Sequence, residues 1–403
     1  MTAQSFDKQS SVSRLNKNWL DRSQIDIEQL IALLSNRIDK PAVPLASDLV
    51  QQVPVYNAKT LRNRLAEELS GDFLKALQSE WKWVWESGPG ILVIQGAFYD
   101  ELTMDQVNQV FAELIKLEKD SGLAAGDHFA KPGANNRVWN ALEKLCLYKP
   151  QLFARYYSNE LLAYAAEAWL GPAYQITSQV NCVNPGGMAQ VAHRDYHLGF
   201  MTPEHAERYP EQVHRLSPLL TLQCAIAQVD MPLESGPTLY LPHSQKYAQG
   251  YLLADYKPFH DYFAKHRIQI PLKRGDLVMF NPALIHAAGS NTSKDIQRLA
   301  NLLQISSAFG RSLESVDRLT MSKALYPELA ELKATGELSE IEIDCAIAAC
   351  AEGYPFPTNL DLDPPIGGLA PPSQAAHFRT ALSENWSAEQ FNAKIDLQAQ
   401  WRG

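Results

Sequence analysis

The chain has 403 residues, of which 46% are hydrophobic and 20% charged, so it can bury a large core and differs in composition from disordered proteins. Its net charge of −9 and the lack of a long Lys/Arg run disfavour nucleic acid and anionic membranes as partners. No apolar run reaches the ~18 residues that a membrane-spanning helix needs. The composition therefore predicts a globular protein that binds neither nucleic acid nor membrane.

Five cysteines stand far apart in the sequence and include no CxxC pair. This pattern favours reduced, buried thiols over a disulfide framework or a zinc site. The N-terminal stretch Met1 to Asn18 is polar, and we expect it to form a loose tail. It lacks the apolar segment of a signal peptide, so we expect a cytoplasmic protein.

The first part of the chain has helical spacing of apolar residues, interrupted by one strand-like run. Thr103 to Gln106 also form a capping-box pattern, which predicts that a helix starts there. The predicted helices are Asp26 to Ile38, Leu61 to Trp85, a helix after Thr103, Arg137 to Tyr157 and Leu161 to Leu170, and the predicted strand is Ile91 to Ile94.

From Tyr174 the pattern changes to short β-rich runs separated by Gly, Pro and Asn. Many such runs in about 130 residues predict an antiparallel sandwich or barrel. The runs are Tyr174 to Val183, Gln190 to His193, Leu219 to Val229, Thr238 to Leu241, Ile268 to Leu272, Leu277 to Phe280 and Leu299 to Ser306.

His193 and Asp195 are two residues apart in one of these β-rich stretches, so their side chains would share a face of a strand. A second histidine, His286, follows the run that ends at Phe280. Two histidines and one carboxylate form the facial triad of non-haem Fe(II) oxygenases, which leaves metal positions open for a cosubstrate and O₂. Arg298 begins the next β-rich run, and a guanidinium can bind a carboxylate through two hydrogen bonds.

Three segments together resemble the phytanoyl-CoA dioxygenase family of Fe(II)/2-oxoglutarate-dependent oxygenases. They are His193 to His197 (HRDYH), Glu234 to Ser244 (ESGPTLYLPHS) and Lys273 to Asn281 (KRGDLVMFN), followed by His286 and Arg298, and the opening strand Gly90 to Gly96 agrees. The resemblance covers about residues 88–309. It predicts an oxygenase domain at 88–309, an N-terminal helical extension at 1–87, and a C-terminal helical or loop extension at 310–403 that packs on the core.

The resemblance implies a mainly β fold with added helices, built on a double-stranded β-helix or jelly-roll. It implies Fe(II) bound by the catalytic residues His193, Asp195 and His286, with 2-oxoglutarate and O₂ as cosubstrates. Arg298 would anchor 2-oxoglutarate and Arg137 would assist it. Family members often carry Ser two residues after the second histidine, where this chain has Ala288, so the contacts around the cosubstrate are expected to differ.

Further side chains are candidates for substrate contacts. His197 would share the face of His193 and Asp195 if the strand continues, either as a ligand, a substrate contact or a plain pocket residue. Tyr196 is a further candidate from the same motif. Gln179 and Asn181 alternate on a predicted strand, so their amides would bind substrate or cosubstrate, or else backbone or water.

The predicted activity is hydroxylation or another oxidation of an unactivated C–H bond of a small organic substrate, with release of succinate and CO₂. The alternatives are a 2-oxoglutarate-independent metal enzyme of the same fold and a non-catalytic binding protein. A halogenase is disfavoured because Asp195 fills the position that halide would need. The sequence identifies neither the substrate nor the oligomeric state.

Overall fold

The computed structural model describes residues 18–68, 70–121, 134–197, 199–357, 359–365, 367 and 370–402. The predicted N-terminal tail lies almost entirely outside these residues. Within them, no helix combines the length and the apolar character needed to cross a membrane. All five cysteines are buried and form no disulfide, as the sequence predicts.

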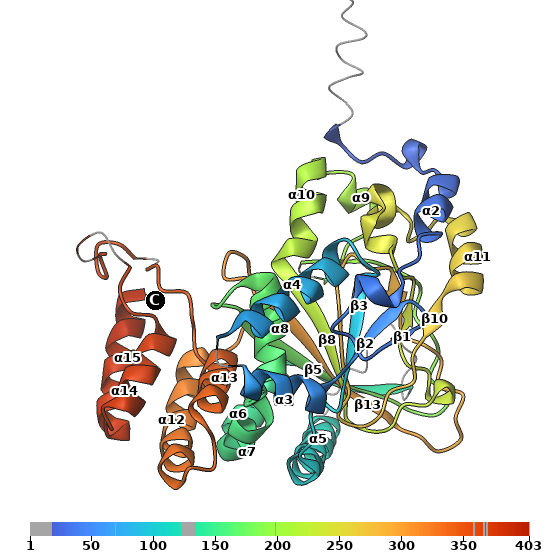
Figure 1. Cartoon of the computed structure of the whole chain (residues 1–403). Helices are drawn as coiled ribbons and strands as arrows, with labels where there is room; N and C mark the ends of the chain where they lie inside the picture. The colour runs from blue at the N-terminus through green and yellow to red at the C-terminus, as the bar shows by residue number, and fades with distance from the viewer. Residues whose placement is uncertain are drawn as a thin grey trace, which may run out of the picture.

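A large mixed sheet forms the centre of the protein, with eight strands in the described residues (Figure 1). Strands β2 and β3 pair in parallel, and the other neighbours pair antiparallel. In spatial order the strands are β1 (Asp48–Val50), β2 (Val53–Asn57), β3 (Ile91–Gln95), β11 (Leu277–Phe280), β8 (Thr221–Ala227), β13 (Arg298–Ser306), β5 (Gln175–Val183) and β4 (Asn135–Val138).

Two smaller sets of strands complete the barrel. One is the sheet of β10 (Ile268–Gln269), β9 (Leu239–Tyr240) and β12 (His286–Ala287), and the other is the hairpin of β6 (Asp195–Tyr196) and β7 (Gly199–Phe200). Side chains alternate along each strand, so Ile91 and Val93 pack between the sheets while Leu92 and Ile94 pack against the helices. The result is the predicted jelly-roll fold, although helices make up more of the chain than the description "mainly β" suggests.

Helices cover the outer face of the large sheet. The first group is α3 (Ala58–Glu67), α4 (Asp72–Glu86), α5 (Glu101–Asp120), α6 (Ala141–Tyr148), α7 (Pro150–Tyr157) and α8 (Glu160–Leu170). The C-terminal group is α12 (Arg318–Thr335), α13 (Glu340–Cys350), α14 (Gln374–Ser383) and α15 (Ala388–Arg402). Helices α12 and α13 pack on α6 to α8, and α14 and α15 pack in turn on α12 and α13, away from the N-terminal segment (residues 18–34) (Figure 1).

Several local predictions differ from the structure. The predicted long helix Leu61 to Trp85 is two helices, because Gly71 adopts a left-handed conformation between them. Helix α5 begins at Glu101 and is capped by Asp100, so Thr103 is not its first cap. Residues 190–193 contain one isolated bridge instead of a strand, and the N-terminal region contributes β1 and β2 in addition to helices. The domain boundaries stay a prediction.

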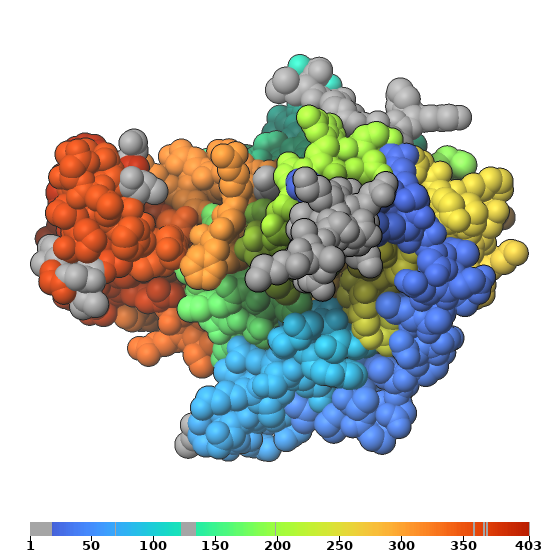
Figure 2. Space-filling model, turned by 90° about the horizontal axis from the view of Figure 1, so that it is seen from above, coloured from blue at the N-terminus to red at the C-terminus, as the bar shows by residue number. Residues whose placement is uncertain are grey.

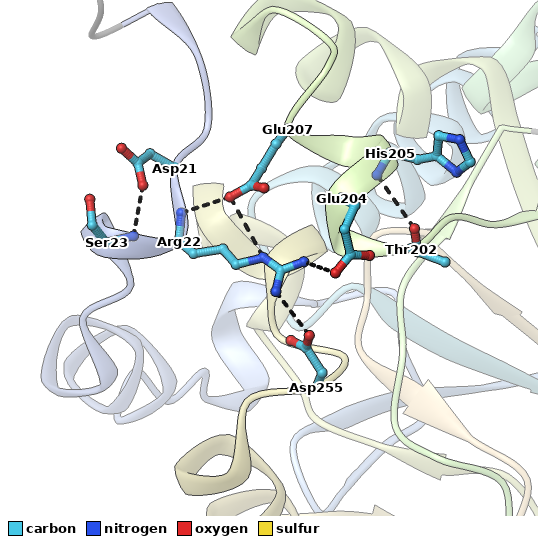
Figure 3. A network of polar contacts seen from close by, with 8 residues as sticks. All are labelled: Asp21, Arg22, Ser23, Thr202, Glu204, His205, Glu207 and Asp255. Atoms are coloured by element: carbon cyan, nitrogen blue, oxygen red, sulfur yellow. Dashed lines mark hydrogen bonds and ion pairs between the residues drawn. The ribbon is translucent and has the colours of Figure 1, made fainter.

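The N-terminal segment lies against the rim of the barrel next to α9 (Pro203–Ala206), α10 (Glu211–Leu216) and α11 (Lys257–His266) (Figure 2). Arg22, just before α2 (Ile27–Leu34), points its guanidinium at three carboxylates, those of Glu204, Glu207 and Asp255 (Figure 3). These acidic residues come from two separate segments. Arg22 is therefore the shared cation that fastens the N-terminal segment to this rim.

Replacing Arg22 should release the segment without unfolding the core. In Arg22→Ala, three neighbouring carboxylates lose their shared cation and repel one another, while exposed ion pairs contribute little to global stability. Chymotrypsin should cleave faster after Trp19 or Leu20, and the thermal midpoint should stay near that of the wild type. The control is Lys116→Ala, which removes an exposed pair with Asp120 on α5. Equal cleavage rates in the two variants would contradict the assignment.

Candidate metal centre

The backbones of His193 and His286 form an isolated antiparallel bridge. Each peptide N–H donates to the other residue's carbonyl, with both N···O distances 3.0 Å. This bridge sets the two imidazoles side by side, with ring centroids 4.6 Å apart. Two residues after His193, the β6 strand returns the carboxylate of Asp195 to the same face.

The three side chains converge on one point. Asp195 Oδ1 lies 3.8 Å from His193 Nε2, and Asp195 Oδ2 lies 3.6 Å from His286 Nε2. One ligand atom from each residue lies within 4.8 Å of the other two. The distances and the ligand types suit a divalent transition metal bound on one face.

Backbone carbonyls set the orientation of both imidazoles. His193 Nδ1 lies 2.7 Å from the carbonyl of Val191, and His286 Nδ1 lies 2.8 Å from that of Leu284. A carbonyl only accepts, so each Nδ1 carries the proton and each Nε2 lone pair is left for a metal. Burial and the neighbouring His286 lower the pKa of His193, although Asp195 acts to raise it. His193 is therefore neutral, as a ligand must be.

The carboxylate of Asp195 is held by a residue that the sequence analysis did not select. Gln223 on β8 donates from Nε2 to Asp195 Oδ2 over 2.6 Å. Burial acts to raise the pKa of Asp195, but the neighbouring His286 and His193 and the Gln223 amide outweigh it and hold the pKa below its usual value. Asp195 is thus ionised and oriented before any metal binds.

A cavity of about 700 Å³ runs from this cluster into the barrel. Val191 and Phe200 line it and are largely exposed, so the end with the triad opens to solvent. The inner end is walled by buried apolar residues that include Met231 and Leu272. A ligand can therefore enter past the triad and extend into a water-poor interior.

Arg298 is the cation of this inner end. It is 6% exposed, lines the cavity, and donates from Nη1 to the carbonyl of Gly289 over 3.4 Å. In the described part of the chain, no carboxylate lies within ion-pair distance of its guanidinium. Burial lowers the pKa of Arg298 to about 10, so it stays charged at neutral pH. A buried cation facing a cavity calls for an anion from outside the chain.

Arg137, Gln179 and Asn181 also line the cavity. Arg137 is on strand β4, where it pairs with Asn181, and not on the predicted helix. Its Nη1 donates to Gln179 Oε1 over 3.4 Å, and its guanidinium stacks 4.9 Å from the ring of Trp139. The chain is extended at Arg137 before α6 begins. The apolar residues after Arg137 have helical spacing, so the sequence predicted a helix over the end of this short strand.

Tyr196 and His197 do not line the cavity. Tyr196 points to the opposite side of β6, where its hydroxyl hydrogen-bonds His214 Nδ1 at 2.5 Å and its ring stacks on Tyr251. His197 lies in the turn after β6, and its Nδ1 is 2.6 Å from Thr221 Oγ1. Because β6 ends at Tyr196, His197 does not share a strand face with His193 and Asp195, as it would if the strand continued.

The sequence analysis also missed Trp139, Phe200 and Leu313, which line the open end. The ring of Phe200 stands edge-on to that of His193, with centroids 5.8 Å apart. Nothing in a single sequence distinguishes these apolar residues from others. Gln223 carried only a weak signal, because the predicted run Leu219 to Val229 also contains Thr221 and a second carboxamide, Gln228.

A buried connection ties the two ligand segments together from behind. Arg194, between the two ligands of the HRD motif, donates to the carbonyl of Ser244. Ser244 Oγ in turn accepts from the backbone N–H of Ile285 over 2.8 Å, next to His286. The guanidinium of Arg194 packs directly against Gly250. A Cβ at that position would lie 1.9 Å from the guanidinium carbon, so no larger residue fits there. Ser244 therefore joins the segment before β6 to the segment before β12.

A jelly-roll with two histidines and a carboxylate at its open end defines the class of non-haem metal oxygenases. The chain belongs to the phytanoyl-CoA dioxygenase (PhyH) family, whose model matches residues 89–299, more than half of the chain. This family is one of iron- and 2-oxoglutarate-dependent enzymes. No curated protein sequence matches the chain.

Several solved structures are similar to this chain at low identity. The epimerase SnoN, in complex with Fe³⁺, alpha ketoglutarate and nogalamycin RO, is 19% identical over 58% of this chain and 85% of its own, with a TM-score of 0.41. The alpha ketoglutarate dependent carbocyclase SnoK from nogalamycin biosynthesis is 20% identical over 58% and 86%, with a TM-score of 0.42. HygX from Streptomyces hygroscopicus, with nickel and 2-oxoglutarate bound, is 15% identical over 57% and 87%, with a TM-score of 0.41.

The Ser244 connection predicts a coupled loss of stability and metal affinity. In Ser244→Ala the buried N–H of Ile285 loses its acceptor, which should lower the free energy of unfolding by about 1–3 kcal/mol. Metal affinity should fall by roughly 10- to 100-fold, as is typical when support behind a ligand is removed. Denaturant unfolding and metal titration measure the two effects.

The control for this variant is Ser322→Ala, which removes another fully buried serine hydroxyl, on α12. It should change stability and leave metal affinity intact. An unchanged metal affinity in Ser244→Ala would show that Ser244 supports the fold without positioning the ligands.

Proposed function

We propose that the protein is an Fe(II)- and 2-oxoglutarate-dependent dioxygenase that hydroxylates, or otherwise oxidises, an unactivated C–H bond of a small organic substrate, with release of succinate and CO₂. One observation carries the proposal. A His193, Asp195 and His286 cluster lies in the same cavity as a buried Arg298 that has no carboxylate partner among the described residues. The cluster suits Fe(II), and the arginine suits an anion.

The residues present fit both groups. Two neutral imidazoles and one carboxylate are the donor set of non-haem Fe(II) sites, and their Nε2 and oxygen atoms point at one another. Arg298 has donors left after its single bond to Gly289, and its planar fork matches a carboxylate. When bound, the iron supplies the redox chemistry that couples decarboxylation of 2-oxoglutarate to oxidation of the substrate.

The chain's own contribution is to bind, orient and exclude water. His193, Asp195 and His286 hold the metal on one face and leave its other side toward the cavity. Arg298 binds the far carboxylate of 2-oxoglutarate, and Arg137 assists from β4. Apolar walls around Arg298 keep that contact dry, which strengthens it. The substrate occupies the open end, where Phe200 and Leu313 line the cavity.

The position of Arg298 favours this function over a 2-oxoglutarate-independent metal enzyme. Such an enzyme needs the triad, but it has no use for a charged guanidinium at the inner end of the cavity. A buried guanidinium without a partner lowers the stability of the protein. The charge of Arg298 is therefore best explained by a carboxylate that the ligand provides.

The first test is metal binding. The protein should bind one Fe(II) per chain, and His193→Ala, Asp195→Ala and His286→Ala should each weaken binding by more than about 100-fold, because two remaining ligands hold the ion poorly and the loss exceeds that of an outer-shell partner. Anaerobic titration measures the affinities. His266→Ala, on the exposed end of α11, is the matched histidine control. Full affinity in all three triad variants would refute the assignment.

The second test concerns the cosubstrate. Arg298→Ala removes a charge-assisted contact worth roughly 1.5–3 kcal/mol, so the KM for 2-oxoglutarate should rise about 10- to 150-fold. Arg298→Lys should recover part of this, since an ammonium cannot reproduce the fork, and Arg137→Ala should give a smaller rise. Succinate release is the readout, with a small-molecule collection supplying candidate substrates in the presence of Fe(II) and ascorbate.

Arg267→Ala, an exposed arginine at the end of α11, serves as the control for the arginine variants. Its KM for 2-oxoglutarate should equal that of the wild type. Substrate turnover without consumption of 2-oxoglutarate, or a KM that ignores Arg298→Ala, would instead assign the protein to the cosubstrate-independent metal enzymes.

A further inference from the structure

Two glutamine side chains face each other at the open end of the cavity. Gln223 on β8 and Gln304 on β13 are direct partners in the antiparallel ladder, so their side chains leave the sheet side by side on the same face. Both line the cavity. We call them the glutamine pair.

The amide nitrogen of Gln223 donates to Asp195, while its amide oxygen has no partner among the described residues. A carboxylate only accepts, so the group facing Asp195 Oδ2 is the Nε2 donor and the orientation of the amide is determined. The Oε1 atom then faces away from Asp195. It is buried and accepts no hydrogen bond from any described residue, although Gln223 as a whole is only 4% exposed.

Gln304 has a side chain available in the same way. Its backbone carbonyl accepts from Thr177 Oγ1, but its side-chain amide makes no hydrogen bond within the described residues. Gln304 is partly exposed, whereas the unpaired Oε1 of Gln223 is buried. A buried carboxamide oxygen without a donor is costly, and native proteins leave few of them. The glutamine pair thus offers acceptors and donors to a ligand beside the metal centre.

The surroundings of the pair restrict the charge of that ligand. Among the described residues that line the cavity, the charged groups at neutral pH are Asp195, Arg137 and Arg298. The proposed function uses Asp195 for the metal and the two arginines for 2-oxoglutarate. Trp139, Phe200 and Leu313 add apolar and aromatic side chains to the wall, and the other polar side chains that line it, which include Gln179, Asn181 and Gln190, are uncharged. A charged substrate would lose its hydration there without gaining a counter-ion.

We infer that the glutamine pair is the specificity determinant of the site, and that it selects an uncharged substrate with an apolar or aromatic body that carries an N–H or O–H group next to the carbon to be oxidised. The donor on the substrate would bond to Gln223 Oε1, and Gln304 would bond to the adjoining polar atom. An ionised carboxylate cannot donate and would meet lone pairs, whereas an amide, lactam or hydroxyl matches the pair. This inference rests on the proposed function.

The test uses three probes of similar size that differ in charge: phenylacetamide, phenylacetate and phenethylamine. Each is titrated without oxygen into protein saturated with Fe(II) and 2-oxoglutarate, so that Arg298 is already occupied. We expect phenylacetamide to bind at least about 10-fold more tightly than either charged probe, since those lose hydration without a partner charge. A charged probe that binds as tightly as the amide, or no preference among the three, would overturn the inference.

A pair of variants tests whether the glutamines cause the preference. Gln304→Leu keeps the size of the side chain and should weaken phenylacetamide binding about 2- to 13-fold, the equivalent of one net hydrogen bond, without weakening phenylacetate. The matched control is Gln297→Leu, the same exchange at an exposed position just before β13, which should change no affinity. Equal phenylacetamide affinities in wild type and Gln304→Leu would overturn the role of the pair.

The same samples separate this inference from the function on which it depends. Fe(II) and 2-oxoglutarate binding are measured before any probe is added. If both bind and the probe order is reversed, the metal centre stands and the substrate class is wrong. If neither binds, the proposed function itself fails.

Discussion

The site depends on one backbone contact, the bridge in which His193 and His286 exchange their N–H and carbonyl hydrogen bonds. These residues lie far apart in the chain, and two further backbone hydrogen bonds support the bridge, from Gln190 N to the carbonyl of Ala288 and from Asp195 N to the carbonyl of Pro282, each over 3.0 Å. Because β6 and β12 are each two residues long, few further ladder bonds hold the ligands. The positions of both imidazoles therefore follow from this bridge and from the groups that support it.

The supporting groups act from different sides. Ser244 and Arg194 join the ligand segments from behind, through one backbone carbonyl and one hydroxyl. Gln223 acts from the large sheet, where β8 lies between β11 and β13 and is held by ladders on both sides. The short strands that carry the ligands are thus supported by a longer, central strand, and the link that reaches a ligand itself is the carboxamide of Gln223.

The sequence predicted the fold from the local patterns of its strands, whereas the role of His286, far along the chain from Asp195, came from the resemblance to the family. Alternation marks strands such as β5, a short apolar run marks β11, and the spacing of His193 and Asp195 places both on one face. The errors arise where the outcome depends on distant contacts. Tyr196 and His197 were judged from a strand that ends after two residues, and Arg137 was placed on a helix because its strand β4 exists only through pairing with β5. The role of Gln223 depends on the register between β8 and the β6 segment, which no local pattern records.

The charges of the cavity explain why its two ends treat ligands differently. With His193 neutral and Asp195 ionised, a divalent metal leaves one net positive charge at the open end. In the proposed complex, the two negative charges of 2-oxoglutarate cancel against that metal site and against Arg298, while Arg137 assists the same cosubstrate and lies within electrostatic reach of Glu314. Once these charges are balanced, long-range attraction no longer selects a substrate. Selection then falls to short-range hydrogen bonds and shape, and the carboxamides of Gln223 and Gln304 are neutral groups beside the metal centre that can provide such hydrogen bonds.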